Sequence, residues 1–223
     1  MPFSGGIDSL SNGTLLFSAA AAFFYLLMQS QPPSWRRTAA KTLSIGLLAV
    51  LAAIEGGPVL LIVALALSAA GDAFLAQEGE KAFLGGLGSF LLAHMAYVAL
   101  FAIAGGGMEI LAVQAWRLGI PVIATAAALL LVVRLMPAVG PALKLPVTLY
   151  VAAIAAMMWT SATVPVPIVM VGAALFLASD PILAIEKFLL SPASPHRAWA
   201  GPAVWILYWL AQVTITLGFL VQS

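Results

Sequence analysis

Long apolar stretches, separated by short segments rich in glycine and proline, constrain this sequence more than any other feature. A helix that crosses a bilayer needs about 20 mostly apolar residues. Eight stretches qualify, near residues 13–29, 38–54, 58–77, 83–104, 115–136, 141–160, 165–187 and 201–221. Because 63% of the residues are hydrophobic and 8% are charged, the chain has too little polar surface to cover itself in water. The sequence therefore predicts an all-α, polytopic membrane protein, with eight transmembrane helices in one bundle over residues 1–223.

The positive charges predict how this bundle is oriented. With the N-terminus outside, the predicted inner ends and loops hold eight cations: Arg36, Arg37, Lys41, Lys81, Arg134, Lys144, Lys187 and Arg197. The predicted outer side holds only Arg117. Cytoplasmic loops carry the excess of Lys and Arg, so we expect both termini outside (N-out, C-out). The abundance of Ala, Gly and Pro suggests a bacterium with a GC-rich genome, and hence the inner membrane.

Composition excludes several functional classes. The net charge of +1 argues against a nucleic-acid partner, because such partners need many phosphate-neutralising cations. The chain has no cysteine, which excludes disulfides, thiolate nucleophiles and cysteine zinc sites. It has two histidines, too few for a three-histidine zinc site. We expect no metal site.

Similar motifs recur along the chain and predict two four-helix halves, residues 13–104 and 115–221. The stretch "GDAFLAQEGEKAFL" resembles "SDPILAIEKFLL", and "LLAHMAYVALF" loosely resembles "WLAQVTITLGF". Lys41 begins the second apolar stretch much as Lys144 begins the sixth. Because each half has an even number of helices, both halves would share one orientation, as in a parallel repeat.

Two aspartates lie within the predicted helices, at equivalent positions of this repeat. At 1.5 Å per residue, Asp72 lies roughly 8 Å and Asp180 roughly 10 Å below the inner surface. A carboxylate at such a position costs about 2.5–3.5 kcal/mol on insertion scales unless it faces a cavity or a partner. Each could simply pair with Lys41 or Lys144 and join helices. The matched pair favours a functional role.

Further polar side chains would lie near these aspartates. Lys41 and Lys144 either extend to the inner interface or flank a polar cavity and meet a phosphate group or the aspartates. His94 is either a proton carrier or a hydrogen-bonding residue between helices. Other candidates for lining the same space, each also explicable by packing or hydrogen bonding, are Tyr97, Tyr150, Ser179, Tyr208 and Gln212.

Four motifs in this order resemble those of the YhhN-type lysoplasmalogenase family: "GDAFLA", "FLGGLGSFLLAHMAYVALF", "GAALFLASDPILAIEKF" and "YWLAQ". The resemblance runs from about Lys41 to Gln212. It implies hydrolysis of the vinyl ether bond of lysoplasmalogen to a fatty aldehyde and glycerophosphoethanolamine or glycerophosphocholine. The implied partners are this single-chain ether phospholipid and the bilayer. No protein partner is evident, and no metal or organic cofactor is implied.

Vinyl ether cleavage needs an acid to protonate the β-carbon, a base to activate water, and negative charge near the oxocarbenium ion. Two carboxyl groups in a pocket of low dielectric constant fit these needs, one protonated and the other ionised. We expect Asp72 and Asp180 to be this pair, in either order, with His94 assisting. Tyr97 and Gln212 would orient water or the acid, and Lys41 and Lys144 would bind the phosphate in a cavity open to the cytoplasmic leaflet.

Two other functions agree with the same residues. Intramembrane aspartates and parallel repeats also occur in small-molecule or proton-coupled transporters. A different intramembrane lipid hydrolase, using a metal-bound water, is the second alternative.

Overall fold

Helices make up nearly the whole of the chain. The computed structural model describes residues 1–191 and 193–221. In this part the α-helices are α1 (Leu10–Met28), α2 (Trp35–Ile54), α3 (Val59–Leu75), α4 (Glu80–Ala104), α5 (Gly107–Val113), α6 (Gly119–Leu135), α7 (Pro141–Ala162), α8 (Pro167–Phe188) and α9 (Arg197–Leu220). Two 3₁₀ turns accompany them, η1 (Gly6–Asp8) and η2 (Ala115–Leu118). The all-α prediction is confirmed for the described residues.

Seven of the described helical segments are long and apolar enough to cross a membrane, counting η2 and α6 as one segment. The eighth predicted span is α3, which is apolar but 17 residues long. The count of eight spans therefore stays a prediction. Large apolar side chains such as Phe17, Phe23 and Val133 are exposed, which is typical of helices that face lipid.

The predicted helix bounds differ from those of the structure by four residues at most. One such difference is the start of α6 at Gly119 rather than at residue 115. Pro121 explains this start, because proline lacks an N–H and is tolerated in the first turn of a helix. Elsewhere, polar caps mark the starts: the hydroxyl groups of Ser9 and Ser34 accept hydrogen bonds from the amides of Asn12 and Arg37.

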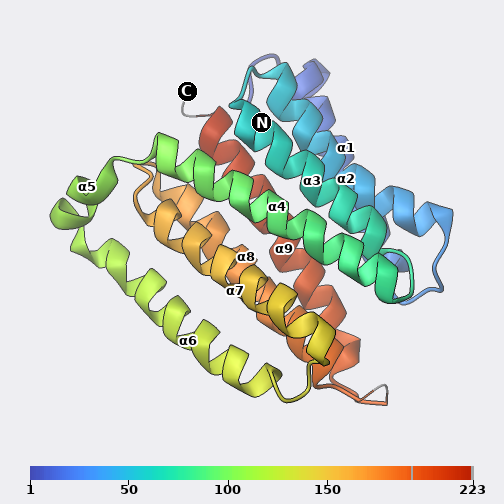
Figure 1. Cartoon of the computed structure of the whole chain (residues 1–223). Coiled ribbons are helices and arrows are strands. Elements are labelled where there is room, and N and C mark those ends of the chain that lie inside the picture. Colours follow the sequence, from blue (N-terminus) through green and yellow to red (C-terminus); the bar gives the residue numbers. More distant parts are fainter. Residues whose placement is uncertain (192, 222–223) are drawn as a thin grey trace.

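Consecutive long helices run in opposite directions along the bundle (Figure 1). Helices α1, α2 and α3 form one side, α6 forms the opposite edge, and α4, α7, α8 and α9 lie between them. The loops after α1, α3 and α6 and the end of α8 lie at one end of the bundle, whereas α5, the start of α1 and the end of α9 lie at the other (Figure 1). The predicted inner cations belong to the first end and Arg117 to the second; which end faces the cytoplasm stays a prediction.

In two helix pairs, α3 with α4 and α8 with α9, the helices approach each other closely at a glycine. A Cβ at Gly172 of α8 would lie 3.0 Å from the backbone nitrogen of Ile215 in α9. A Cβ at Gly86 of α4 would lie 2.5 Å from Leu75 Cδ2 at the end of α3. These contacts hold α3 against α4 and α8 against α9, and so fix the two helices that carry the aspartates.

Candidate active site

Asp72 lies near the C-terminal end of α3, and only 1% of its surface is exposed. Lys41 Nζ, from α2, lies 3.3 Å from Asp72 Oδ1. The hydroxyl of Tyr208, from α9, donates a hydrogen bond of 2.8 Å to Asp72 Oδ2. The Lys41 ammonium group also lies 5.5 Å from the ring centre of Tyr25. Asp72 is thus a buried carboxylate with a cation and a hydroxyl donor as partners.

Asp180 lies in α8, immediately before Pro181, and is 9% exposed. The hydroxyl of Tyr150, from α7, donates a hydrogen bond of 3.0 Å to Asp180 Oδ2, and Ser179 Oγ lies 3.2 Å from Asp180 Oδ1. His94 Nε2, from α4, lies 3.9 Å from Asp180 Oδ2. Within the described part of the chain, no lysine or arginine forms an ion pair with Asp180.

His94 has one nitrogen engaged and one nitrogen that faces Asp180. Its Nδ1 lies 2.6 Å from the carbonyl oxygen of Phe90. Because a carbonyl only accepts hydrogen bonds, Nδ1 carries a proton; in a neutral ring, Nε2 is then an acceptor. Nε2 is buried and has no hydrogen-bond partner among the described residues. The rings of Tyr150 and Phe176 pack against the imidazole with centroid distances of 5.2 and 4.7 Å, which fixes its orientation.

Both aspartates line one polar cavity with a volume of about 390 Å³. Four more of the predicted site residues line it: Lys41, Tyr150, Ser179 and Tyr208. The cavity extends to residues 77–79 between α3 and α4, at the end of the bundle that holds most of the cations. The structure thus brings the two carboxyl groups into one space, with different partners for each.

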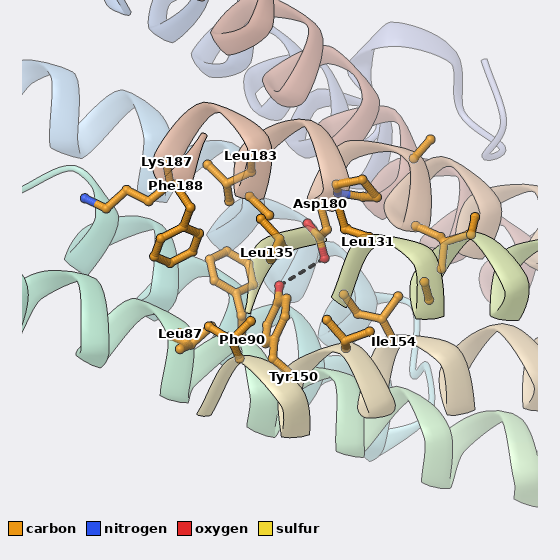
Figure 2. Close-up of a pocket in the computed structure, with 18 of the residues that line it drawn as sticks. Leu87, Phe90, Leu131, Leu135, Tyr150, Ile154, Asp180, Leu183, Lys187 and Phe188 are labelled. Atoms are coloured by element: carbon orange, nitrogen blue, oxygen red, sulfur yellow. Dashed lines mark hydrogen bonds between the residues drawn. The ribbon is translucent and has the colours of Figure 1, made fainter. Parts of the chain in front are cut away.

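A second cavity, of about 670 Å³, lies between α4, α6, α7 and α8 and is lined mainly by apolar side chains. Asp180 and Tyr150 belong to the walls of both cavities. Figure 2 shows their hydrogen bond among the apolar side chains of Phe90, Leu131 and Ile154. A hydrocarbon-lined space therefore adjoins the polar one at Asp180.

Four predicted site residues are not among the described residues that line these two cavities: Tyr97, Gln212, Lys144 and His94. Tyr97 donates a hydrogen bond of 2.5 Å to Gln212 Oε1, and both side chains are fully buried. Lys144 is exposed at the start of α7, and it is not among the described residues that line either cavity. His94 is in contact with the site through Asp180 rather than through the cavity wall.

Three cations at the polar cavity were not predicted as site residues: Arg37, Lys187 and Arg197. Arg197 is engaged with Glu186, whose backbone carbonyl accepts a hydrogen bond of 2.7 Å. The Nε atom of Arg37 is buried and lacks a hydrogen-bond partner among the described residues. A sequence signal for Arg37 was available, because it precedes Lys41 by four residues and so shares its helix face.

The partners of the two aspartates come from corresponding helices of the predicted repeat. Asp72 is contacted by Lys41 of α2 and Tyr208 of α9. Asp180 is contacted by Tyr150 of α7, with His94 of α4 close by. In the predicted repeat, α2 corresponds to α7 and α4 to α9. Each carboxyl group therefore meets the second helix of its own half and the fourth helix of the other half.

These features define a class: a helical membrane protein with two buried carboxyl groups that face a shared polar cavity. Among the described residues, His, Asp and Glu side chains form no group of three or more that could hold a metal ion. The chain belongs to the YhhN family, whose sequence profile matches residues 36–219.

Two curated relatives are named lysoplasmalogenase, one from Mycobacterium bovis and one from Mycobacterium tuberculosis. Each is 37% identical to this chain over 167 residues, which cover 71% of this chain and 59% of the relative. The match thus spans about 59% of the length of these relatives. No solved structure matches the chain.

Proposed function

We propose that this chain hydrolyses the vinyl ether bond of lysoplasmalogen and releases a fatty aldehyde and glycerophosphoethanolamine or glycerophosphocholine. The observation that carries the proposal is the shared cavity of Asp72 and Asp180, in which Asp72 forms an ion pair with Lys41 and Asp180 forms none with the lysines and arginines of the described residues. Membership of the YhhN family, and relatives named lysoplasmalogenase, support the choice of substrate.

In the proposed mechanism Asp180 is the acid and Asp72 is the base. Asp180 gives its proton to the β-carbon of the vinyl ether, and the positive charge is shared by the α-carbon and the ether oxygen. Water adds to the α-carbon and gives a proton to the Asp72 carboxylate. The hemiacetal then breaks its bond to the glycerol oxygen, which takes the proton from Asp72. The hemiacetal hydroxyl proton passes to Asp180. One water molecule is consumed, and both carboxyl groups return to their starting states.

The partners of the two aspartates support this order. Asp72 has in Lys41 the counter-ion that a buried carboxylate needs. Asp180 forms no ion pair with lysine or arginine among the described residues, and its burial without such a partner favours the protonated form. His94 Nε2 lies 3.9 Å from Asp180 Oδ2, beyond hydrogen-bond distance. A closer approach during turnover would let it accept a hydrogen bond from the protonated carboxyl group and assist the return of the proton.

The basic residues at the mouth of the polar cavity would bind the phosphate of the head group. Arg37 and Lys187 line this cavity, and the unpaired Nε of Arg37 would donate to a phosphate oxygen. We propose that this end of the bundle faces the cytoplasm, that eight helices cross the membrane, and that the two halves are a parallel repeat. The distribution of Lys and Arg supports the orientation, and the corresponding partners of the aspartates support the repeat.

The test is release of aldehyde from lysoplasmalogen by the purified chain in detergent. Asp72→Asn and Asp180→Asn should each abolish turnover, because Asn preserves the shape and removes both the charge and the proton. Asp8→Asn is the matched control, since Asp8 is the remaining aspartate of the chain and lies exposed in η1. A variant at position 72 or 180 that keeps most of its activity would refute the paired-carboxylate mechanism.

The same assay separates the alternatives. A transporter would release no aldehyde at all, and this result with the folded wild-type protein would refute the proposed hydrolysis. A hydrolase that uses a metal-bound water would lose its activity in EDTA and regain it with zinc. Activity that persists in EDTA is the result expected for the two carboxyl groups.

A further inference from the structure

We infer that the larger, apolar cavity binds the alkenyl chain of the substrate, so that the head group and the chain occupy separate cavities that meet at Asp180. This inference rests on the proposed function and deepens it. It assigns to α6, which carries none of the candidate catalytic residues, the role of forming the wall of a binding site for one hydrocarbon chain.

Small side chains on α6 and α8 line the apolar cavity. Ala124, Ala127 and Ala128 of α6 belong to its wall, and their spacing puts them on one face of the helix. Ala178 and Pro181 of α8 also line it. The resulting volume of about 670 Å³ falls within the roughly 300–1,000 Å³ typical of ligand pockets. Empty cavities with apolar walls stay dry and take up apolar ligands.

The chemistry requires the acid to lie near the point where the head group and the hydrocarbon chain of the substrate are joined. The β-carbon that receives the proton is the second carbon of the chain, only three bonds from the glycerol carbon. The acid must therefore lie where head group and chain meet. Asp180 and Tyr150 are wall residues of both cavities, and the rest of the chain then continues into the apolar cavity.

One hydrocarbon chain is the occupant that this continuity favours. The polar cavity has cations and carboxyl groups at its walls, whereas the adjoining cavity is lined mainly by apolar side chains, with Arg134 and Lys187 as its cations among the described residues. A molecule that fills both spaces has an anionic end and one apolar chain, which is the structure of a lysophospholipid. A bilayer lipid that enters from the membrane without using the polar cavity is the competing occupant, and the experiment distinguishes the two.

The first experiment narrows the apolar cavity. Ala128→Phe places a ring in its wall, while Ala126→Phe is the matched control, because Ala126 is exposed and is not among the described lining residues. Aldehyde release is measured with a full-length alkenyl chain and with one several methylenes shorter. Ala128→Phe should lower kcat/KM for the long chain at least ~10-fold relative to the short one, since one methylene in a hydrophobic pocket discriminates by ~10–200-fold. Equal loss for both chains would overturn the inference.

The second experiment uses the wild-type chain and needs no hydrolysis. A saturated alkyl lysophospholipid with a photoreactive diazirine in its chain lacks the vinyl ether and is not cleaved. Labelling should be saturable, should map to residues 124–135 and 177–184, and should be displaced by the same saturated alkyl lysophospholipid without the diazirine. Labelling that does not saturate and spreads over exposed faces of α1 and α6 would indicate surface lipid and overturn the inference.

The two readouts separate this inference from the proposed function. Aldehyde release without saturable labelling of these segments would leave the hydrolysis standing and remove the chain-binding cavity. If the protein is labelled saturably but releases no aldehyde, the cavity for single-chain lipids is supported and the proposed hydrolysis is refuted.

Discussion

Replacing Lys41 with Met should expose how strongly the site depends on one buried ion pair. Lys41 Nζ and Asp72 Oδ1 are 3.3 Å apart, with 11% and 1% of the two side chains exposed. At an effective dielectric constant of 20, two unit charges at this distance attract by about 5 kcal/mol. Removal of one partner from a buried pair typically costs 3–5 kcal/mol, because the other charge stays buried without compensation.

We expect Lys41→Met to lower the free energy of unfolding by about 3 kcal/mol, at the low end of that range, because Tyr208 still donates a hydrogen bond to Asp72. Asp72→Asn should cost less, about 1–2 kcal/mol, because Lys41 keeps its contacts with the rings of Tyr25 and Trp205. The double variant buries no charge at position 72. It should cost less than the sum of the single changes, with a coupling energy of about 2–3 kcal/mol.

The measurement is unfolding in mixed micelles of detergent and SDS, followed by tryptophan fluorescence, for the wild type and the three variants. Aldehyde release is measured on the same preparations. The double variant should regain stability and no activity, which separates the fold from the chemistry. If the single changes add to within about 0.5 kcal/mol, the buried ion pair does not stabilise this protein as we reason.

Two further predictions concern the head group and the acid. Arg37→Gln should raise KM for lysoplasmalogen and change kcat little. Arg36→Gln is the control and should change neither, because the Arg36 side chain is exposed and lies 5.7 Å from the ring centre of Trp35. Equal effects of the two substitutions would contradict a phosphate site at Arg37. His94→Phe keeps a ring against its aromatic neighbours and removes Nε2, so kcat should fall at least ~10-fold, less than the ~10²–10⁴-fold effect of a direct acid or base, with KM nearly unchanged. An unchanged kcat would show that His94 only packs against Asp180.

The helices could be predicted closely because the bilayer makes length and apolarity the dominant signals. The differences arise where local chemistry decides. The 17-residue α3 is shorter than the stretch predicted at 58–77, and the segment before α6 forms α5 and a 3₁₀ turn that apolarity does not signal. Arg117 is fully buried in that turn and donates hydrogen bonds to the carbonyl groups of Ala162 and Val164, contacts that no local pattern predicts.

The residues of the polar cavity could be predicted less completely, because the register between helices is not written in local sequence. Lys41 and Lys144 were predicted as equivalent positions, but their contacts differ. Lys41 pairs with Asp72, whereas the residue of α7 that contacts Asp180 is Tyr150, six residues after Lys144. Six residues of helix span about 9 Å, so the side chain that reaches the second aspartate lies deeper than the predicted lysine. Likewise, Tyr97 and Gln212 were predicted to line the site, but they form a hydrogen bond with each other and are not among the described residues that line either cavity.

The contrast between the two aspartates is the feature by which the proposed repeat would support the proposed acid and base chemistry together. Equivalent carboxyl groups with identical partners would share one protonation behaviour, and neither would be set apart for a role. Here α2 contributes a cation to Asp72, whereas α7 contributes a phenol to Asp180. Likewise, α9 contributes a hydroxyl donor to Asp72, whereas α4 places an imidazole near Asp180. The chemical difference between the two sites therefore lies in the partners, so exchanging partners, rather than carboxyl groups, is the change that should reverse the proposed roles.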